Sequence, residues 1–181
     1  MSTPAVGWPE PLVIDQDKDM LGLGGYAVFN EARTHRYLLY RRWGYGPDMT
    51  WIMLNPSTAD AFADDPTIRR CISFTRREGC GSLRVVNLFA LRATDPRELR
   101  KHPDPVGPSN DQTIDVEASR GTFIAAAWGA DATAIERGRE VGRRLIAAGL
   151  SLACLGVTSA GHPRHPLYVR SDAPLIPWEA A

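Results

Sequence analysis

Short apolar segments alternate with amphipathic segments through most of the chain, and this alternation limits the folds that the sequence can adopt. An apolar run of this length is typical of a buried strand, and the segments between the runs have the spacing of helices. Strands that alternate with helices predict a mostly parallel sheet with helices on both faces, a three-layer α/β/α architecture. The predicted strands are 50–54, 83–88, 122–128 and 150–155, and the predicted helices begin at Asp65-Pro66, at Ser109 or Asn110, and at Ala130.

The N-terminal part follows a different pattern. Residues 26–30 and 36–43 read as two strands joined by a polar turn, which predicts a β-hairpin in addition to the α/β sheet. Residues 1–20 are polar and contain prolines, which favours a loosely ordered N-terminal arm. A chain of 181 residues has the size of one domain, so we expect a single α/β domain over residues 21–181.

The charge balance restricts the partners that we expect. The 21 basic and 21 acidic residues give a net charge of zero, which does not favour strong non-specific binding to nucleic acid. Any role on nucleic acid must therefore depend on a local patch, and residues 33–101 carry thirteen bases against seven acids. We expect a cytoplasmic protein with reduced thiols and no metal, because no apolar run could span a membrane and the three cysteines match no zinc pattern.

Polar or aromatic motifs follow the four predicted strands. Asn55 comes after the first strand, Asn87 lies late in the second, Trp128 follows the third, and residues 162–165 follow the fourth. Ligands of open α/β sheets bind at the carboxyl ends of the strands. The sequence therefore predicts a ligand site where these motifs meet.

Each motif allows a structural role as well as a functional one. Pro56 favours extended backbone at Asn55, so the Asn55 amide either binds a water or polar ligand or closes an Asx turn. An amide in a buried strand must be hydrogen-bonded, so Asn87 either supports a neighbouring loop or matches the edge of a nucleobase. His165 lies in a proline-rich loop, where a neutral imidazole could stabilise a developing anion, or the loop could be an ordinary surface loop.

Six motifs in order resemble a bacterial and phage family catalogued as domain of unknown function 1643. The resemblance covers roughly residues 25–178 and by itself implies no activity. The motifs are N-P-S-T-A-D at 55–60, D-P-T-I-R-R at 65–70, N-L-F-A-L-R-A-T-D-P at 87–96, G-P-S-N-D at 107–111, A-W-G at 127–129 and H-P-L-Y at 165–168.

A more distant resemblance links the chain to the uracil-DNA glycosylase superfamily. It implies a glycosylase-like sheet in which Asn55 positions the attacking water, Asn87 reads the base edge and His165 stabilises the departing base. It also implies base contacts from Phe62 and Trp128. Further residues would contact the phosphates or take the place of the base in the DNA stack, namely Ser57, Arg69, Arg70, Arg92, Arg164, Leu167 and Tyr168. Some members hold an iron–sulfur cluster on four cysteines, but this chain has three, so we expect no cofactor.

The expected function is that of a DNA glycosylase-like protein in base excision repair. It would recognise a flipped or modified nucleobase and hydrolyse its N-glycosidic bond. Three alternatives remain: a non-catalytic module that binds a nucleotide or modified base, a hydrolase acting on free nucleosides or nucleotides, and a plain interaction protein. The expected partner is thus DNA or a nucleotide, with no membrane contact.

Overall fold

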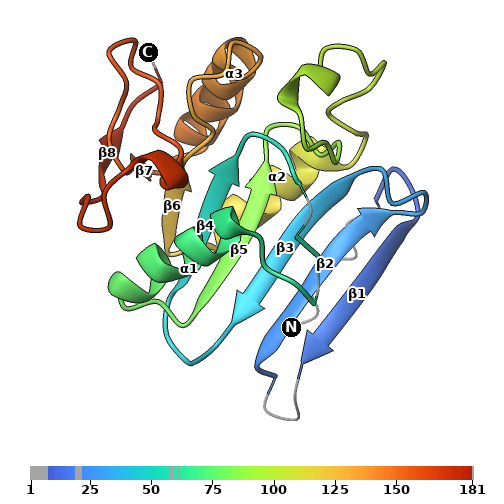
Figure 1. The fold of residues 1–181 in the computed structure, drawn as a ribbon, viewed down its shortest axis with the longest axis horizontal. Coiled ribbons are helices and arrows are strands. Elements are labelled where there is room, and N and C mark those ends of the chain that lie inside the picture. Colours follow the sequence, from blue (N-terminus) through green and yellow to red (C-terminus); the bar gives the residue numbers. More distant parts are fainter. Residues whose placement is uncertain (1–7, 19–21, 58, 61, 181) are drawn as a thin grey trace.

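A computed structural model describes residues 8–18, 22–57, 59–60 and 62–180, and these form one mixed β-sheet (Figure 1). Its eight strands follow the order β1-β2-β3-β5-β4-β6-β7-β8. The strands are β1 (Leu12–Lys18), β2 (Gly24–Asn30), β3 (Arg36–Arg42), β4 (Asp48–Met53), β5 (Ser82–Asn87), β6 (Phe123–Ala126), β7 (Leu152–Cys154) and β8 (Ile176–Trp178). The helices are α1 (Pro66–Arg77), α2 (Asn110–Arg120) and α3 (Ala134–Ala147), with short 3-10 turns η1 (Pro96–Glu98) and η2 (Pro166–Tyr168).

The prediction of a mostly parallel α/β/α sheet with a glycosylase-like arrangement is wrong. Four of the seven strand pairings are antiparallel: β1–β2, β2–β3, β3–β5 and β7–β8. Parallel pairing is confined to the centre, where β5, β4, β6 and β7 lie side by side. The alternation of strands and helices describes this centre only.

The predicted hairpin accounts for most of the error. Its two strands, β2 and β3, are not an addition to the sheet but continue it, because β3 pairs directly with β5. Residues 12–18, within the stretch predicted as an N-terminal arm, extend the meander as β1, while residues 1–7 and 19–20 lie outside the described part. A short antiparallel strand, β8, follows β7 on the other side. An antiparallel meander needs only short turns, so its strands join the sheet without crossover helices.

The helices cover both faces of the sheet (Figure 1). Helix α1 packs Ile68, Cys71 and Phe74 against one face, together with Trp51 of β4. Helices α2 and α3 pack against the opposite face, where Ile114 belongs to the same buried cluster as residues from the central strands. The apolar residues of the sheet therefore point alternately into two cores, as the two-residue period of a strand requires.

Helix α1 begins where its sequence predicts. The Asp65 carboxylate accepts a hydrogen bond from the Ile68 backbone N–H at 2.8 Å, and Pro66 occupies the first turn. An aspartate cap satisfies one of the unpaired N–H groups of the first turn, and proline there loses no intrahelical bond. The start of α1 thus fixes the Asp65 carboxylate beside the ends of the parallel strands.

The described residues contain no helix that is long and apolar enough to cross a membrane. Within the same residues, no group of three or more His, Cys, Asp or Glu side chains could hold a metal ion. Cys71, Cys80 and Cys154 are buried free thiols. Burial raises the pKa of the Cys80 and Cys154 thiols, so they stay protonated at neutral pH.

Candidate functional site

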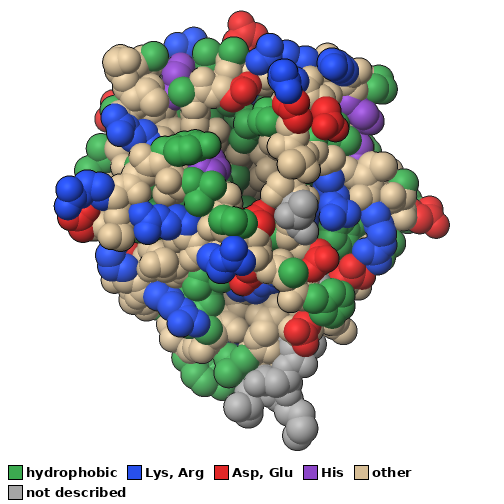
Figure 2. All heavy atoms as spheres, viewed as in Figure 1, with side chains coloured by type: hydrophobic (Ala, Val, Ile, Leu, Met, Phe, Trp, Pro, Cys, Tyr) green, Lys and Arg blue, Asp and Glu red, His purple; other side chains and the backbone are tan. Residues whose placement is uncertain are grey.

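A cavity of about 570 Å³ lies at the carboxyl ends of the parallel strands, between α1 and the loops that follow β6 and β7. Figure 2 shows the molecule hollowed above α1, with hydrophobic and basic side chains around the opening. This volume lies within the range of small-molecule sites, roughly 300–1,000 Å³. Seven of the predicted site residues line the cavity: Asn55, Ser57, Asn87, Trp128, Arg164, His165 and Tyr168.

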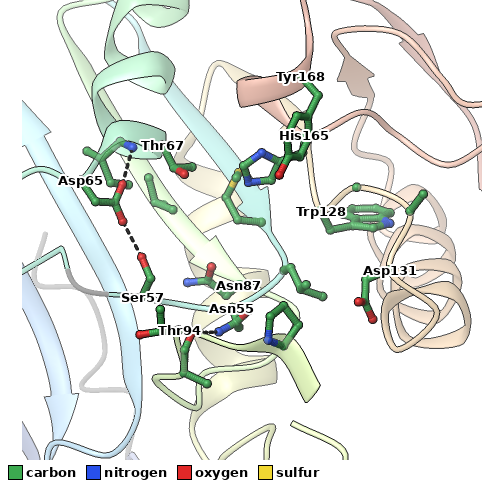
Figure 3. A pocket seen from close by; sticks show the side chains of 18 of the residues that line it. Asn55, Ser57, Asp65, Thr67, Asn87, Thr94, Trp128, Asp131, His165 and Tyr168 are labelled. Carbon is green, nitrogen blue, oxygen red and sulfur yellow. Dashed lines mark hydrogen bonds between the residues drawn. The ribbon is translucent and has the colours of Figure 1, made fainter. Parts of the chain in front are cut away.

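Asn87, the last residue of β5, gives the clearest sign of a ligand. Its side chain is 1% exposed, and its Nδ2 has no hydrogen-bond partner among the described residues. Asn110 performs the structural role that Asn87 could have had, since its amide donates to the backbone carbonyls of Asn87 and Leu88 at 3.0 Å each. An unpaired buried donor is costly, so an Asn87 amide on the cavity wall (Figure 3) is best explained by a ligand.

The two buried asparagines should respond oppositely to the same substitution. Asn87→Leu removes a buried amide whose Nδ2 is unpaired and should leave the free energy of unfolding unchanged or raise it by about 1 kcal/mol. Asn110→Leu removes two hydrogen bonds and should lower that free energy by about 2 kcal/mol. Urea unfolding of both variants would measure the difference. A loss in Asn87→Leu as large as that in Asn110→Leu would contradict the assignment of Asn87 to ligand binding.

Asn55 follows β4, and its amide is only partly free. Its Nδ2 donates to the carbonyls of Ala93 at 2.7 Å and Pro56 at 3.0 Å, which fastens the end of β4 to the loop after β5. These bonds fix the orientation of the amide, and Oδ1 has no hydrogen-bond partner among the described residues. Asn55 can therefore accept a hydrogen bond from a water or a ligand in the cavity (Figure 3).

His165 lies opposite, at the start of η2 (Figure 3). Its Nδ1 accepts a hydrogen bond from the Leu167 backbone N–H at 3.3 Å. Burial lowers the pKa of His165, although the nearby Asp65 carboxylate opposes this. The imidazole is therefore neutral at pH 7 with its proton on Nε2, so it can donate one hydrogen bond to a ligand.

Aromatic rings form part of the cavity wall. Trp128 is buried after β6 and packs edge-on against Trp178, with ring centroids 5.0 Å apart. Tyr168 is exposed at the rim, and its ring lies 5.5 Å from that of His165. Trp128 is thus a fixed wall, whereas Tyr168 stands where it can contact a ligand that enters.

Two carboxylates also line the cavity, and both already have partners. Asp65 caps α1 through one oxygen and accepts the Ser57 hydroxyl through the other at 2.6 Å. Burial tends to raise the pKa of Asp131, but hydrogen bonds from Thr133 and the charge of Arg100 outweigh it and lower that pKa. The Asp131 carboxylate therefore carries negative charge at neutral pH, and a ligand should not place an anionic group beside it.

The remaining predicted residues do not line the cavity. Arg70 donates to the backbone carbonyls of Pro166 at 3.3 Å and Val169 at 2.7 Å, so it holds η2, and with it His165, against α1. Arg69 donates to the Asp64 carbonyl, and Arg92 to the Arg33 carbonyl at 3.3 Å. Phe62 and Leu167 are exposed outside the cavity.

Several cavity residues were not predicted from the sequence, Asp65 and Asp131 among them, and the one with a buried charge is Arg36. It begins β3, within the hairpin that was predicted to be separate from the sheet. Because β3 runs antiparallel to β5, its first residue lies at the same edge as the carboxyl ends of the parallel strands. The length and polarity of the hairpin contain no signal for this pairing.

A family model described as Protein of unknown function (DUF1643) matches residues 36–167. This range includes all the predicted site residues except Tyr168, the neighbour of its last residue. Searches of curated proteins and of solved structures gave no significant match. The resemblance to the uracil-DNA glycosylase superfamily therefore depends on the sequence motifs alone.

Proposed function

The chain belongs to the DUF1643 family, and we propose that its cavity binds a nucleobase and hydrolyses the N-glycosidic bond of that base. The observation that carries the proposal is the buried Nδ2 of Asn87 on the cavity wall, which has no hydrogen-bond partner among the described residues. The order of the Asn55, Asn87 and His165 motifs, which resembles that of the uracil-DNA glycosylase superfamily, supports the same reaction.

Recognition would depend on the two functions of the Asn87 amide. Its N–H₂ donates and its oxygen accepts, so it complements a ring edge on which a carbonyl stands next to an N–H. Uracil, thymine, hypoxanthine and xanthine carry such an edge. A base without it would leave the Asn87 donor unpaired in a buried place, and this would reduce its affinity.

Hydrolysis would use His165 and Asn55 on either side of the scissile bond. The bond between the anomeric carbon and the base nitrogen breaks, and its electron pair goes to the base. The Nε2–H of His165 donates to the base oxygen on which negative charge develops. Water oriented by Asn55 Oδ1 adds its hydroxyl to the anomeric carbon, and its remaining proton passes to solvent, from which the departed base takes one up.

A cleavage screen tests this proposal. Labelled single- and double-stranded oligonucleotides would carry uracil, hypoxanthine, xanthine, hydroxymethyluracil or a thymine mismatch, and alkali would reveal abasic sites. The matching nucleosides and nucleotides would be followed by chromatography of the free base. We expect the wild type to release at least one of these bases and Asn87→Leu to release none. The absence of free base from every substrate would refute hydrolysis.

A second candidate is a non-catalytic module that binds the same base. It is favoured by the absence of a free carboxylate near Asn55 among the described residues, because Asp65 and Asp131 are both engaged and an amide is a weak base. Binding of a base that Asn87→Leu abolishes, without any product, would select this candidate.

A further inference from the structure

Arg36 reaches the cavity because of an irregularity in β3. Phe29 pairs with Arg36 whereas the preceding Val28 pairs with Leu38, so Tyr37 is an extra residue on β3. Leu38 belongs to the core under α2 and α3. A regular strand would point Arg36 to that same face, but one extra residue reverses the side. The bulge thus turns the Arg36 side chain toward α1, where it lines the cavity and donates from Nη1 to the Ala59 carbonyl.

The positive charge of Arg36 is buried without a carboxylate partner. The residue is 2% exposed, and among the described residues its Nε has no hydrogen-bond partner and no carboxylate lies within 4.0 Å of its guanidinium. Three other arginines with deeply placed side chains differ. The side chains of Arg41, Arg84 and Arg137 are 11–13% exposed, and each bonds directly to an aspartate. The fold therefore neutralises these three arginines and leaves Arg36 without a direct counter-ion among the described residues.

Arg36 is nevertheless charged at neutral pH. Burial lowers the pKa of its guanidinium to about 10, with Asp65 and Asp60 opposing the decrease and Arg92 and Arg41 adding to it. A buried cation without a carboxylate partner destabilises a fold, because no opposite charge offsets the cost of removing the cation from water. A ligand anion would supply the missing partner, and a guanidinium presents its N–H groups in the fork that matches the oxygens of a phosphate.

We propose that Arg36 forms an anion subsite of the cavity, which takes the terminal phosphate of a free nucleotide while Asn87 takes its base. This inference rests on the proposed function for the identity of the base, but the subsite itself rests on Arg36. The burial of Arg36 favours a terminal phosphate over a phosphodiester within a nucleic-acid strand. A terminal phosphate can enter the cavity alone, whereas an internal phosphodiester would have to bring the adjoining nucleotides with it.

Calorimetric titration of the full chain tests the subsite. The probes are 2′-fluoro derivatives of deoxyuridine and deoxyinosine, whose glycosidic bonds resist cleavage, with their 5′- and 3′-monophosphates. Inorganic phosphate and a single-stranded oligonucleotide with the fluorinated residue inside the strand complete the set. We expect a monophosphate to bind the wild type about 10–100-fold more tightly than its nucleoside, as befits hydrogen bonds to a charged group. Arg36→Met should reduce this ratio to below about threefold. Arg139→Met, which removes an exposed charge on α3 outside the cavity, should keep the ratio.

The outcomes separate the two proposals. Equal binding of nucleoside and monophosphate by the wild type would overturn the anion subsite and leave base recognition standing, and this comparison needs no variant to fold. Phosphate binding that is lost in Arg36→Met, with no binding of any nucleoside or nucleotide, would support the subsite and overturn the proposed base. An oligonucleotide that binds as tightly as the monophosphate would overturn the terminal phosphate in favour of DNA, and no binding by any probe would overturn both proposals.

Discussion

Replacing His165 by alanine is expected to lower the rate of base release by about 10²–10³-fold, the effect of removing one hydrogen-bond donor from a developing anion. The reason is the fixed tautomer of the ring. Because Nδ1 already accepts from the Leu167 N–H, the proton on Nε2 has no role in the loop and is free for the substrate. The loss should appear in kcat, since the base acquires its charge only as the bond breaks.

His162 provides the matched control. It lies in the same loop, also precedes a proline, and does not line the cavity. The hydrogen bonds that link His162 to Thr158 use the backbone of His162, so His162→Ala retains them. Single-turnover rates of the two variants on the substrate found by the screen would measure the difference. Equal rates for His165→Ala and the wild type would show that His165 takes no part in the reaction.

His165→Ala should also change how the free energy of unfolding depends on pH. Burial lowers the pKa of His165 below its ordinary value of 6.5, with Asp65 opposing, so the unfolded chain binds a proton more readily than the folded one. The stabilisation linked to His165 is therefore complete above pH 6.5 and is lost as the pH falls below it. Between pH 7.5 and 5.5, His165→Ala should lose less free energy of unfolding than the wild type, as urea titrations would measure. An equal loss of free energy of unfolding in both proteins would mean that the folded protein does not bury the His165 ring in its neutral form.

The centre of the sheet could be predicted because its residues carry local signals. Asp65-Pro66 predicts the start of α1 through cap chemistry that involves neighbouring residues only, and α1 begins at Pro66. The predicted strands 50–54 and 83–88 overlap most of β4 and β5. Asn55 and Asn87 lie at the carboxyl ends of these strands, and both line the cavity. The carboxyl ends of neighbouring parallel strands lie at the same edge of a sheet, whichever strands flank them. This part of the site could therefore be predicted although the predicted topology of the whole sheet is wrong.

Long-range pairing explains what could not be predicted. The sequence of residues 36–42 contains no local signal that β3 pairs with β5. In addition, a single bulged residue determines whether the Arg36 side chain points toward α1 or toward α2. A two-residue period also allows either face equally until the register is known. Arg70 is a similar case. Its seven-residue spacing from Arg77 predicts that both side chains lie on one face of a helix. Its contacts with the carbonyls of Pro166 and Val169 could not be predicted, because those residues lie almost a hundred positions further along the chain.

Replacing Arg84 by methionine is expected to lower the free energy of unfolding by about 3 kcal/mol, because the buried Glu117 carboxylate then keeps only its pairing with the half-exposed Arg120. Arg84 donates to Asp48 at 2.7 Å and to Glu117 at 2.7 Å, and the Glu117 side chain is 4% exposed. Burial alone would lower the pKa of Arg84, but the bonds to Asp48 and Glu117 outweigh it and raise that pKa. The three charges join β4, β5 and α2 in one network.

Two companion variants make the expectation specific. Arg84→Met combined with Glu117→Leu also removes the buried Glu117 charge and should recover most of the lost stability, since apolar replacement of a buried ion pair is often neutral. Arg144→Met breaks more exposed pairs with Asp111 and Asp115 and should cost below about 1 kcal/mol. Denaturant unfolding of the three variants would show the order, and a double variant no more stable than Arg84→Met would contradict it.

The position of this network also separates stability from function. Asp48 begins β4 and Asn55 follows its end, so the network and the cavity lie at opposite edges of the parallel strands. Arg84→Met should therefore release base at the wild-type rate under conditions in which it remains folded, whereas Asn87→Leu should be inactive although it is at least as stable as the wild type. Activity and stability should respond to different variants in this way because the fold places the Arg84 network at one edge and leaves Asn87 Nδ2 and Arg36 Nε without hydrogen-bond partners at the other.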